Sequence, residues 1–429
     1  MNDGVAKGNA GLGGWSTAGF RLAWLPMKQL SSLERAMIGG IDQAAMLVQV
    51  EQWCAINTGT GNLAGLAQQA GLLADAFAQL PGDLVLIDAP KVAAMGADGQ
   101  EKSVENGRNL VLRVRPEAAR RVLLTGHMDT VFPASDLFQS LTWLDDHTLN
   151  GPGVADMKGG IAVILAALKA FETASAATGL GYDVLINSDE ETGSLSSAAL
   201  IAELAASKHA ALTYEPSALP DGTLAGARGG SGNFAVLIRG KSAHAGRNPQ
   251  DGRNAIVAAA ALVLGLKAIE GEGLAINPAR IDGGAANNVV PDMAVVRFNI
   301  RPATLELAQQ FDTGLQSLLA KVQAEHGVQM SIQGGLSRPP KPLDLPAERL
   351  FKLVKHCGEM LGQPIRWQHS GGVCDGNNIA ACGVPVVDTM GVRGGAIHSS
   401  DEFLIVASLA ERAALSALVL HRLAEGSLS

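Results

Sequence analysis

A short apolar run, residues 184–186, leads through two polar residues into three successive acids: Asp189, Glu190 and Glu191. The apolar run is typical of a buried strand, and Gly193 closes the stretch as a turn residue would. Adjacent carboxylates repel one another unless a cation lies against them. Because the neighbouring sequence offers few basic residues, the acids indicate a site for metal ions.

Two further expected strands end in side chains that bind metals. The run 121–126 delivers His127 and Asp129 to its carboxyl end, and the run 211–214 ends at Glu215. Ligands bind at the carboxyl edge of the strands in open α/β sheets. We therefore expect these side chains to share one edge with the three acids.

The candidate metal ligands are two imidazoles and several carboxylates, without a thiolate: His127, Asp156, Glu190, Glu191, Glu215 and His398. Imidazole with carboxylate suits zinc, and open coordination positions suit catalysis more than structure. Two metal ions a few ångströms apart normally share a carboxylate. The set is therefore large enough for a pair of divalent ions.

The motifs that hold these residues resemble the dizinc peptidase family of aminoacylase, acetylornithine deacetylase and glutamate carboxypeptidase. They are His127-x-Asp129, the glycine-rich loop 151–160, Asp189-Glu190-Glu191-x-Gly193, Glu215-Pro216 and a late His398. The resemblance extends from about residue 41 to the end of the chain. It is nearest to the glutamate carboxypeptidase branch.

The resemblance implies a role for each ligand. Asp156 would bridge two zinc ions, with cobalt or manganese as possible substitutes. One ion would also be bound by His127 and Glu215, and the other by Glu191 and His398.

The same resemblance implies the catalytic groups. Glu190 would be the general base, because the adjacent glutamate that coordinates a metal is not free to accept a proton. Asp129 would hold the His127 ring from behind, which fixes its tautomer. His244, in the motif of residues 240–246, would stabilise the oxyanion, reaching into the site of a partner subunit.

Substrate-binding residues follow from the resemblance as well. Asn288 and Arg301 would grip a substrate carboxylate from a lid, and an arginine fork suits a carboxylate. Arg338, Gly371 and Gly372 would contact the substrate from the main domain.

The sequence departs from the glutamate carboxypeptidase branch at two positions. Thr223 stands where a lysine is expected, and His369 where an arginine is expected. These departures bear on selectivity for glutamate and leave the hydrolytic residues intact.

Composition restricts the class of protein. The 429 residues are 47% hydrophobic, with a net charge of −8 and no run of lysine or arginine, which argues against a nucleic-acid partner. The four cysteines lack metal-finger spacing and are expected to be reduced thiols. Neither a signal peptide nor a membrane span is expected, so the predicted location is the cytoplasm.

The pattern of elements predicts an α/β fold, a zinc-peptidase-like catalytic domain with a mixed sheet between helices. Residues 1–40 are expected to be a flexible arm, and residues 41–228 and 338–429 the catalytic domain. Residues 229–337 would form an inserted α+β lid of four strands and two helices, through which a homodimer would form.

The predicted function is hydrolysis of an amide bond next to a free carboxylate in a small peptide or N-acyl amino acid. An N-acyl amino acid deacylase or a dipeptidase is the alternative within hydrolases. A metal-binding relative without activity is the alternative of another class, although Glu190 and His244 are both present. Interpretations without a functional role also remain: His398 could start a helix, and Arg301 and Arg338 could form surface ion pairs.

Overall fold

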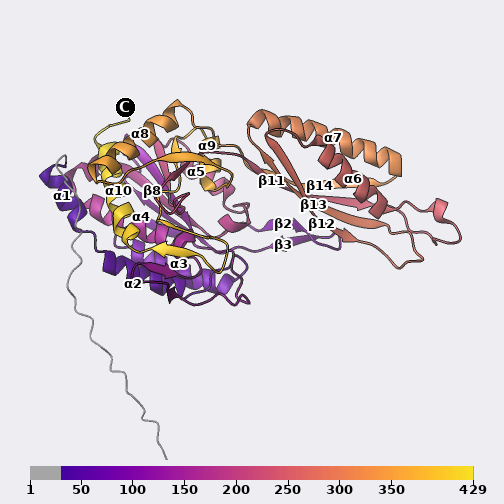
Figure 1. The fold of residues 1–429 in the computed structure, drawn as a ribbon, viewed down its shortest axis with the longest axis horizontal. Coiled ribbons are helices and arrows are strands. Elements are labelled where there is room, and N and C mark those ends of the chain that lie inside the picture. Colours follow the sequence, from indigo (N-terminus) through magenta and orange to yellow (C-terminus); the bar gives the residue numbers. More distant parts are fainter. Residues whose placement is uncertain (1–29, 429) are drawn as a thin grey trace, which may run out of the picture.

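The computed structural model describes residues 30–428, which form a large α/β unit and a narrower unit that projects from it (Figure 1). Most of the expected N-terminal arm, residues 1–29, lies outside the described residues. The expectation of a flexible arm is wrong for residues 32–39, which form helix α1 (Ser32–Gly39). A capping box between Ser31 and Glu34 begins this helix, and Met37 and Ile38 are buried.

The large unit is built on a mixed six-stranded sheet in the order β1-β4-β8-β5-β9-β16. The strands β8, β5, β9 and β16 run parallel, whereas β1 and β4 are antiparallel to their neighbours. The bounds are β1 (Asp83–Ile87), β4 (Asn109–Val114), β5 (Arg121–His127), β8 (Gly181–Asn187), β9 (Ala210–Thr213) and β16 (Val386–Val387).

Successive residues of the buried strands point to opposite faces of this sheet and are apolar on both, so helices cover both faces. The thicker layer packs on Leu110, Leu124 and Ile186, and the thinner layer on Leu123 and Leu185. The thicker layer contains α2 (Gln43–Cys54), α3 (Leu63–Phe77), α4 (Gly160–Glu172), α8 (Leu345–Met360) and α10 (Ala407–Ala424). The thinner layer contains α5 (Ala198–Ala205) and α9 (Asp375–Ala381).

The projecting unit is a four-stranded antiparallel sheet, in the order β12-β13-β11-β14, with two helices on one face (Figure 1). Its elements are β11 (Ser231–Arg239), α6 (Ala255–Ile269), β12 (Leu274–Gly283), β13 (Met293–Pro302), α7 (Leu305–His326) and β14 (Gln329–Arg338). The predicted strands and helices of the insertion are confirmed. We call this unit the lid.

A hairpin of the large unit, β2 (Val92–Met95) and β3 (Glu101–Val104), extends to the lid sheet (Figure 1). The carbonyl oxygen of Met95 accepts a hydrogen bond of 2.8 Å from Arg297 Nη2, and Gly99 lies against Leu237. The sequence did not predict this hairpin, which joins the two units at a second place besides the covalent connections.

Short strands complete the large unit. One small sheet has the order β17-β18-β7-β6, and a pair joins β10 to β15. The bounds are β6 (Thr142–Trp143), β7 (Thr148–Asn150), β10 (Leu224–Arg228), β15 (Trp367–Ser370), β17 (Gly394–Gly395) and β18 (Phe403–Ile405).

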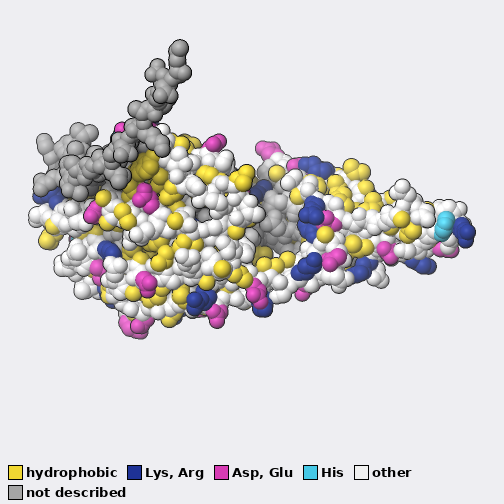
Figure 2. All heavy atoms as spheres, turned by 90° about the horizontal axis from the view of Figure 1, so that it is seen from below, with side chains coloured by type: hydrophobic (Ala, Val, Ile, Leu, Met, Phe, Trp, Pro, Cys, Tyr) yellow, Lys and Arg dark blue, Asp and Glu magenta, His cyan; other side chains and the backbone are white. Residues whose placement is uncertain are grey.

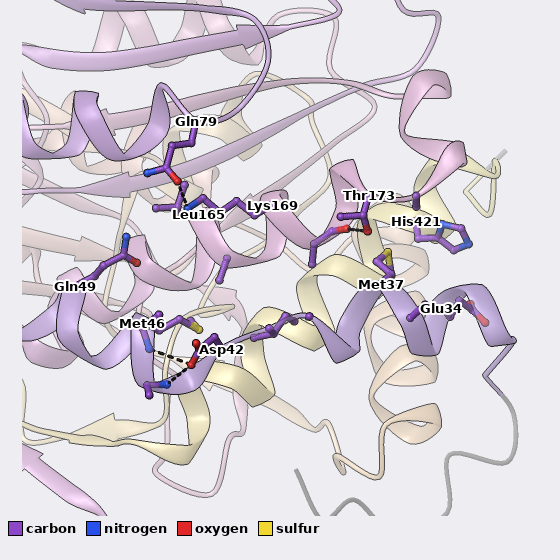
Figure 3. Close-up of a pocket in the computed structure, with 18 of the residues that line it drawn as sticks. Glu34, Met37, Asp42, Met46, Gln49, Gln79, Leu165, Lys169, Thr173 and His421 are labelled. Carbon is purple, nitrogen blue, oxygen red and sulfur yellow. Dashed lines mark hydrogen bonds between the residues drawn. The ribbon is translucent and has the colours of Figure 1, made fainter. Parts of the chain in front are cut away.

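Charged side chains of both signs are scattered over the face seen in Figure 2. Within residues 30–428, no helix is both long enough and apolar enough to cross a bilayer. A hollow of about 1080 Å³ lies beside α1, α2 and α4 and is lined mainly by apolar residues such as Met37, Met46 and Leu165 (Figure 3). This hollow lies apart from the predicted site residues.

Candidate active site

Three adjacent parallel strands bring the first predicted site residues to one edge of the sheet. His127 is the last residue of β5, the three acids follow β8, and Glu215 follows β9 by two residues. The expectation that these strands end at a common edge is confirmed. The sheet therefore positions one imidazole and several carboxylates without any long loop.

Asp156 comes from the loop between β7 and α4. Gly153 adopts a positive φ of 74° there, and the peptide bond between Asp156 and Met157 is cis. Gly160 packs so tightly that a Cβ would collide with the carbonyl oxygen of Tyr214, the residue before Glu215. Such glycines allow the loop to lie directly against the end of β9.

Asp156 faces both histidines of the predicted ligand set. Its Oδ1 lies 3.1 Å from Nε2 of His127, and its Oδ2 lies 3.2 Å from Nε2 of His398. Glu215 Oε2 is 3.7 Å from Nε2 of His127, and Glu191 Oε2 is 3.2 Å from Nε2 of His398. The two carboxylate oxygens of Asp156 thus face two different histidines, and Glu191 lies close enough to join His127 and Asp156 as well.

The spacing of these atoms fits zinc. Two ligand atoms on one tetrahedral zinc, each bound at about 2.0–2.2 Å, lie about 3.3–3.6 Å apart. The distances of 3.1–3.7 Å among the side chains are close to that range. The five residues can therefore hold two ions that share Asp156.

Asp129 lies behind His127, and both side chains are almost fully buried. The ring Nδ1 is 3.0 Å from the carbonyl oxygen of Asp129 and 3.4 Å from its carboxylate. That carboxylate also accepts hydrogen bonds from the backbone N–H groups of Glu190 and Glu191, at 3.2 Å each. Asp129 therefore orients the imidazole and both glutamates.

Glu190 also lies near His127 and Glu215, as a third ligand of one ion would. Its Oε1, however, is 2.6 Å from Nη2 of Arg338. Burial raises the pKa of the Glu190 carboxyl well above its usual range, although the Arg338 guanidinium opposes this. A carboxylate with a raised pKa beside the ligand cluster suits a proton acceptor.

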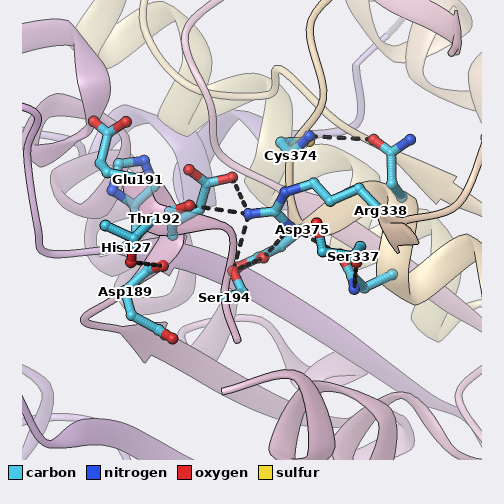
Figure 4. Close-up of polar contacts among 12 residues, drawn as sticks. His127, Asp189, Glu191, Thr192, Ser194, Ser337, Arg338, Cys374 and Asp375 are labelled. Carbon is cyan, nitrogen blue, oxygen red and sulfur yellow. Dashed lines mark hydrogen bonds and ion pairs between the residues drawn. The ribbon is translucent and has the colours of Figure 1, made fainter. Parts of the chain in front are cut away.

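Arg338 lies at the cavity between the large unit and the lid, as expected, but its guanidinium is already engaged by protein groups. It reaches from the end of β14 to Ser194 and Asp375 (Figure 4). Nη1 is 2.7 Å from Asp375 Oδ1, Nη2 contacts Glu190, and the residue is 2% exposed. Its charge is already balanced by two buried acids, so this geometry favours a role in positioning Glu190.

A cavity of about 910 Å³ adjoins the clusters and lies between the large unit and the lid. Arg301, Gly371 and Gly372 line it, as predicted for substrate contacts, and His369 lines it too. The Arg301 side chain is hydrogen-bonded only to Asn299 within the described residues, at 2.8 Å from Nε to Oδ1. Its guanidinium is therefore available to a carboxylate.

The other predicted lid residues do not reach this cavity in the structure. His244 and Asn288 are exposed neighbours on the lid, where Ala245 N–H donates to the carbonyl oxygen of Asn288 at 2.9 Å. Neither lines the cavity. One subunit alone therefore does not place His244 beside the metal ligands in this arrangement of the units.

Sequence reasoning missed three buried groups that support the site. Arg228 is paired with Asp388 at 2.8 Å and donates to the carbonyl oxygen of Gly372 at 2.9 Å, so it holds the glycine loop. Asp375 binds Arg338, and Glu402 binds the loop of Asp156. Glu402 stands four residues after His398 in an otherwise polar turn, which was the available sequence signal.

The electrostatics of the ligand set favour divalent cations. Burial and the charge of Asp156 raise the pKa of Glu191 to about 7. Hydrogen bonds to Asp156 and Glu191 raise the pKa of His398 to about 11. Metal ions that bind there would displace protons from these groups.

Comparison with known proteins agrees with this geometry. Residues 123–422 match the model of Peptidase family M20/M25/M40. Carboxypeptidase G2 of Pseudomonas sp. (strain RS-16) is 29% identical over 395 residues, which cover 90% of this chain and 91% of that protein. Succinyl-diaminopimelate desuccinylase of Xanthomonas oryzae pv. oryzae (strain PXO99A) is 29% identical over 324 residues, which cover 70% of this chain and 83% of that protein.

A solved structure shows the same fold. The Bacillus subtilis YXEP protein, described as a dinuclear metal-binding peptidase, matches with a TM-score of 0.62 at 15% identity and covers 89% of this chain and 98% of that one. The family match extends from β5 to the last helix and contains all six candidate metal ligands. The chain therefore belongs to Peptidase family M20/M25/M40, a family of metallopeptidases and amidohydrolases.

Proposed function

We propose that the protein hydrolyses an amide bond next to a free carboxylate, in the manner of a glutamate carboxypeptidase, with two zinc ions. The observation that carries this proposal is the junction of three features in one cavity. These are the double ligand cluster around Asp156, the carboxylate of Glu190, and the guanidinium of Arg301, which forms no ion pair within residues 30–428.

The donor set suits the two ions. His127, Asp156 and Glu215 would hold one, and Asp156, Glu191 and His398 the other. The chemistry that a bound zinc pair supplies is acidification of a water molecule and polarisation of the scissile carbonyl.

The protein residues supply proton transfer. Glu190 lies beside the cluster without being needed as a ligand, so its carboxylate would take a proton from the attacking water and pass it to the leaving amine. Asp129 keeps Glu190 and His127 in place through their backbone and ring atoms. Arg338 fixes the far oxygen of Glu190, which leaves the other oxygen to face the substrate.

The lid residues would recognise the substrate. Arg301 would bind its free carboxylate, and the loop at Gly371 and Gly372 would border its backbone. His244 and Asn288 are exposed on the lid, which supports a homodimer in which the partner subunit's lid brings them to the site. The expected location of this enzyme is the cytoplasm.

Selectivity for glutamate depends on the two departures from that branch. Thr223 is 7% exposed, does not line the cavity, and bonds through its N–H to Asp221 at 2.9 Å. Thr223 therefore makes no contact with a substrate in the cavity, whereas the longer lysine of that branch would reach one. His369 does line the cavity and is the side chain we propose to vary first for specificity.

Deacylation of an N-acyl amino acid is the second candidate. It would use the same residues, and the similarity to a succinyl-diaminopimelate desuccinylase supports it, although that similarity covers 70% of this chain against 90% for carboxypeptidase G2. The two differ in the acyl group and in the amino acid that is released.

The test is hydrolysis of a panel of folate-type glutamate amides, N-acyl amino acids and dipeptides, with zinc and after chelation. Chelator-sensitive release of glutamate supports the first candidate. Chelator-sensitive release of another amino acid from an acyl donor supports the second. Absence of turnover on the whole panel with two ions bound contradicts both and favours a metal-binding relative without activity.

A further inference from the structure

The Glu402 side chain is fully buried against the loop that carries Asp156. Its Oε1 accepts hydrogen bonds of 3.0 Å from the backbone N–H groups of Ala155 and Asp156, and its Oε2 accepts one of 3.2 Å from that of Gly153. Within residues 30–428 no lysine, arginine or histidine forms an ion pair with it. A buried carboxylate is costly unless hydrogen bonds satisfy it, so these N–H groups are its compensation.

Glu402 also joins two segments that are far apart in the sequence. It lies between His398 and β18, and β18 pairs with β7, which leads into the loop of Asp156. The Glu402 carbonyl oxygen accepts hydrogen bonds from Asn150 Nδ2 at 2.7 Å and from Gly151 N–H at 3.2 Å. The side chain thus ties the loop of Asp156 to the segment of His398.

This tie matters because Asp156 must serve both clusters at once. Its two oxygens lie 3.1 Å from His127 and 3.2 Å from His398. The His398 side chain is half exposed, so packing alone does not fix it. A rotation of the loop that favoured one histidine would move Asp156 away from the other.

We infer that Glu402 is a positioning residue that holds Asp156 in the orientation in which one carboxylate binds two metal ions. This inference rests on the metal site of the proposed function and adds a residue to which no role was assigned. The carboxylate is required because its three hydrogen-bond partners are all donors. A glutamine would place its own N–H2 group against at least one of them.

The test compares Glu402→Gln with Asn150→Ala. The second variant removes a side chain that ties the same two segments, but leaves the carboxylate and its three donors unchanged. Zinc stoichiometry is measured by elemental analysis, and the affinity of each ion by competition with a chelator. We expect Glu402→Gln to weaken the binding of the more weakly held zinc ion by about 10-fold to 100-fold, as losses of such supporting groups do. The zinc affinities of Asn150→Ala should stay near those of the wild type.

A purely structural role is separated by the thermal shift that zinc produces. If Glu402 positions the metal site, the gain in Tm between chelated and zinc-loaded protein shrinks in Glu402→Gln. If this gain and both zinc affinities match the wild type, the inference is overturned, even when the Tm of the chelated protein falls.

The shorter carboxylate of Glu402→Asp serves where the glutamine variant does not fold. It keeps the charge but cannot reach all three donors, so we expect an intermediate loss of affinity for the more weakly held zinc ion. Wild-type zinc binding would overturn the inference. These readouts need no substrate. A wild-type protein that binds two ions but hydrolyses nothing would contradict the proposed function and leave the role of Glu402 standing.

Discussion

Replacement of Arg338 by methionine distinguishes two roles that a guanidinium in this cavity could have. The side chain is 3% exposed, and its nitrogens lie 2.6 Å from Glu190 and 2.7 Å from Asp375. Methionine has a similar length without charge, so the variant removes the cation and leaves two buried acids. A substrate-binding role predicts a higher KM, whereas a positioning role predicts a lower kcat.

The structure sets the expected magnitudes. Removal of one partner from a buried ion pair costs about 3–5 kcal/mol. Asp375 keeps hydrogen bonds from Asn187 and Ser194, at 2.6 and 2.5 Å, so we expect a loss near the lower end of that range. Glu190 loses its only ion pair among the described residues, and a displacement of about 1 Å in a reacting group can lower a rate by about a hundredfold.

The assay measures kcat and KM for the best substrate of the panel, together with the free energy of unfolding in urea. Arg301→Met is the matched control, because it removes the exposed guanidinium of the same cavity and should raise KM with little loss of stability. A folded Arg338→Met protein with wild-type kcat and a KM raised tenfold or more, about 1.4 kcal/mol of lost binding, would refute the positioning role.

Four other outcomes are expected. Glu190→Gln should lower kcat by at least about a hundredfold while two ions remain bound, and near-normal turnover would show that another group is the base. Chelation should lower Tm, since binding stabilises by about 4 kcal/mol per ion when free zinc is about a thousandfold above Kd; an unchanged Tm would argue against ions in the carboxylate cluster. Mixed dimers of Glu190→Gln and His244→Ala subunits should regain activity that neither parent has. The reason is that one of the two sites then combines an intact Glu190 with the intact His244 of the partner subunit. Mixed dimers without activity would place His244 in the site of its own subunit. Arg297→Ala should change kcat and KM together and speed proteolysis of the β2–β3 hairpin, because it removes a contact between the large unit and the lid. Unchanged kinetics and an unchanged cleavage rate would show that the hairpin does not restrain the lid.

The strand ends were predictable from the sequence because a buried parallel strand is a continuous apolar run, and the acids begin where that run stops. His127, Glu190 and Glu215 are fixed in this way by short local patterns. The lid was predictable for a similar reason, since its long helices and strands have clear periodicity.

The remainder depends on contacts that local patterns do not encode. The β2–β3 hairpin consists of two four-residue strands that are mostly exposed, so no apolar period marks it. Arg338 meets Glu190 across 148 positions of sequence, and only the folded chain shows that its charge is already balanced. The distance of His244 from the cavity is set by the arrangement of lid and large unit, which a motif cannot specify.

The most direct test of the metal site is X-ray diffraction from zinc-loaded crystals at wavelengths on both sides of the zinc absorption edge. The account predicts two anomalous peaks about 3.5–4 Å apart, both beside Asp156. His127 and Glu215 should bind one ion, and Glu191 and His398 the other. A single peak at full zinc occupancy, or two peaks that do not share Asp156, would contradict the account.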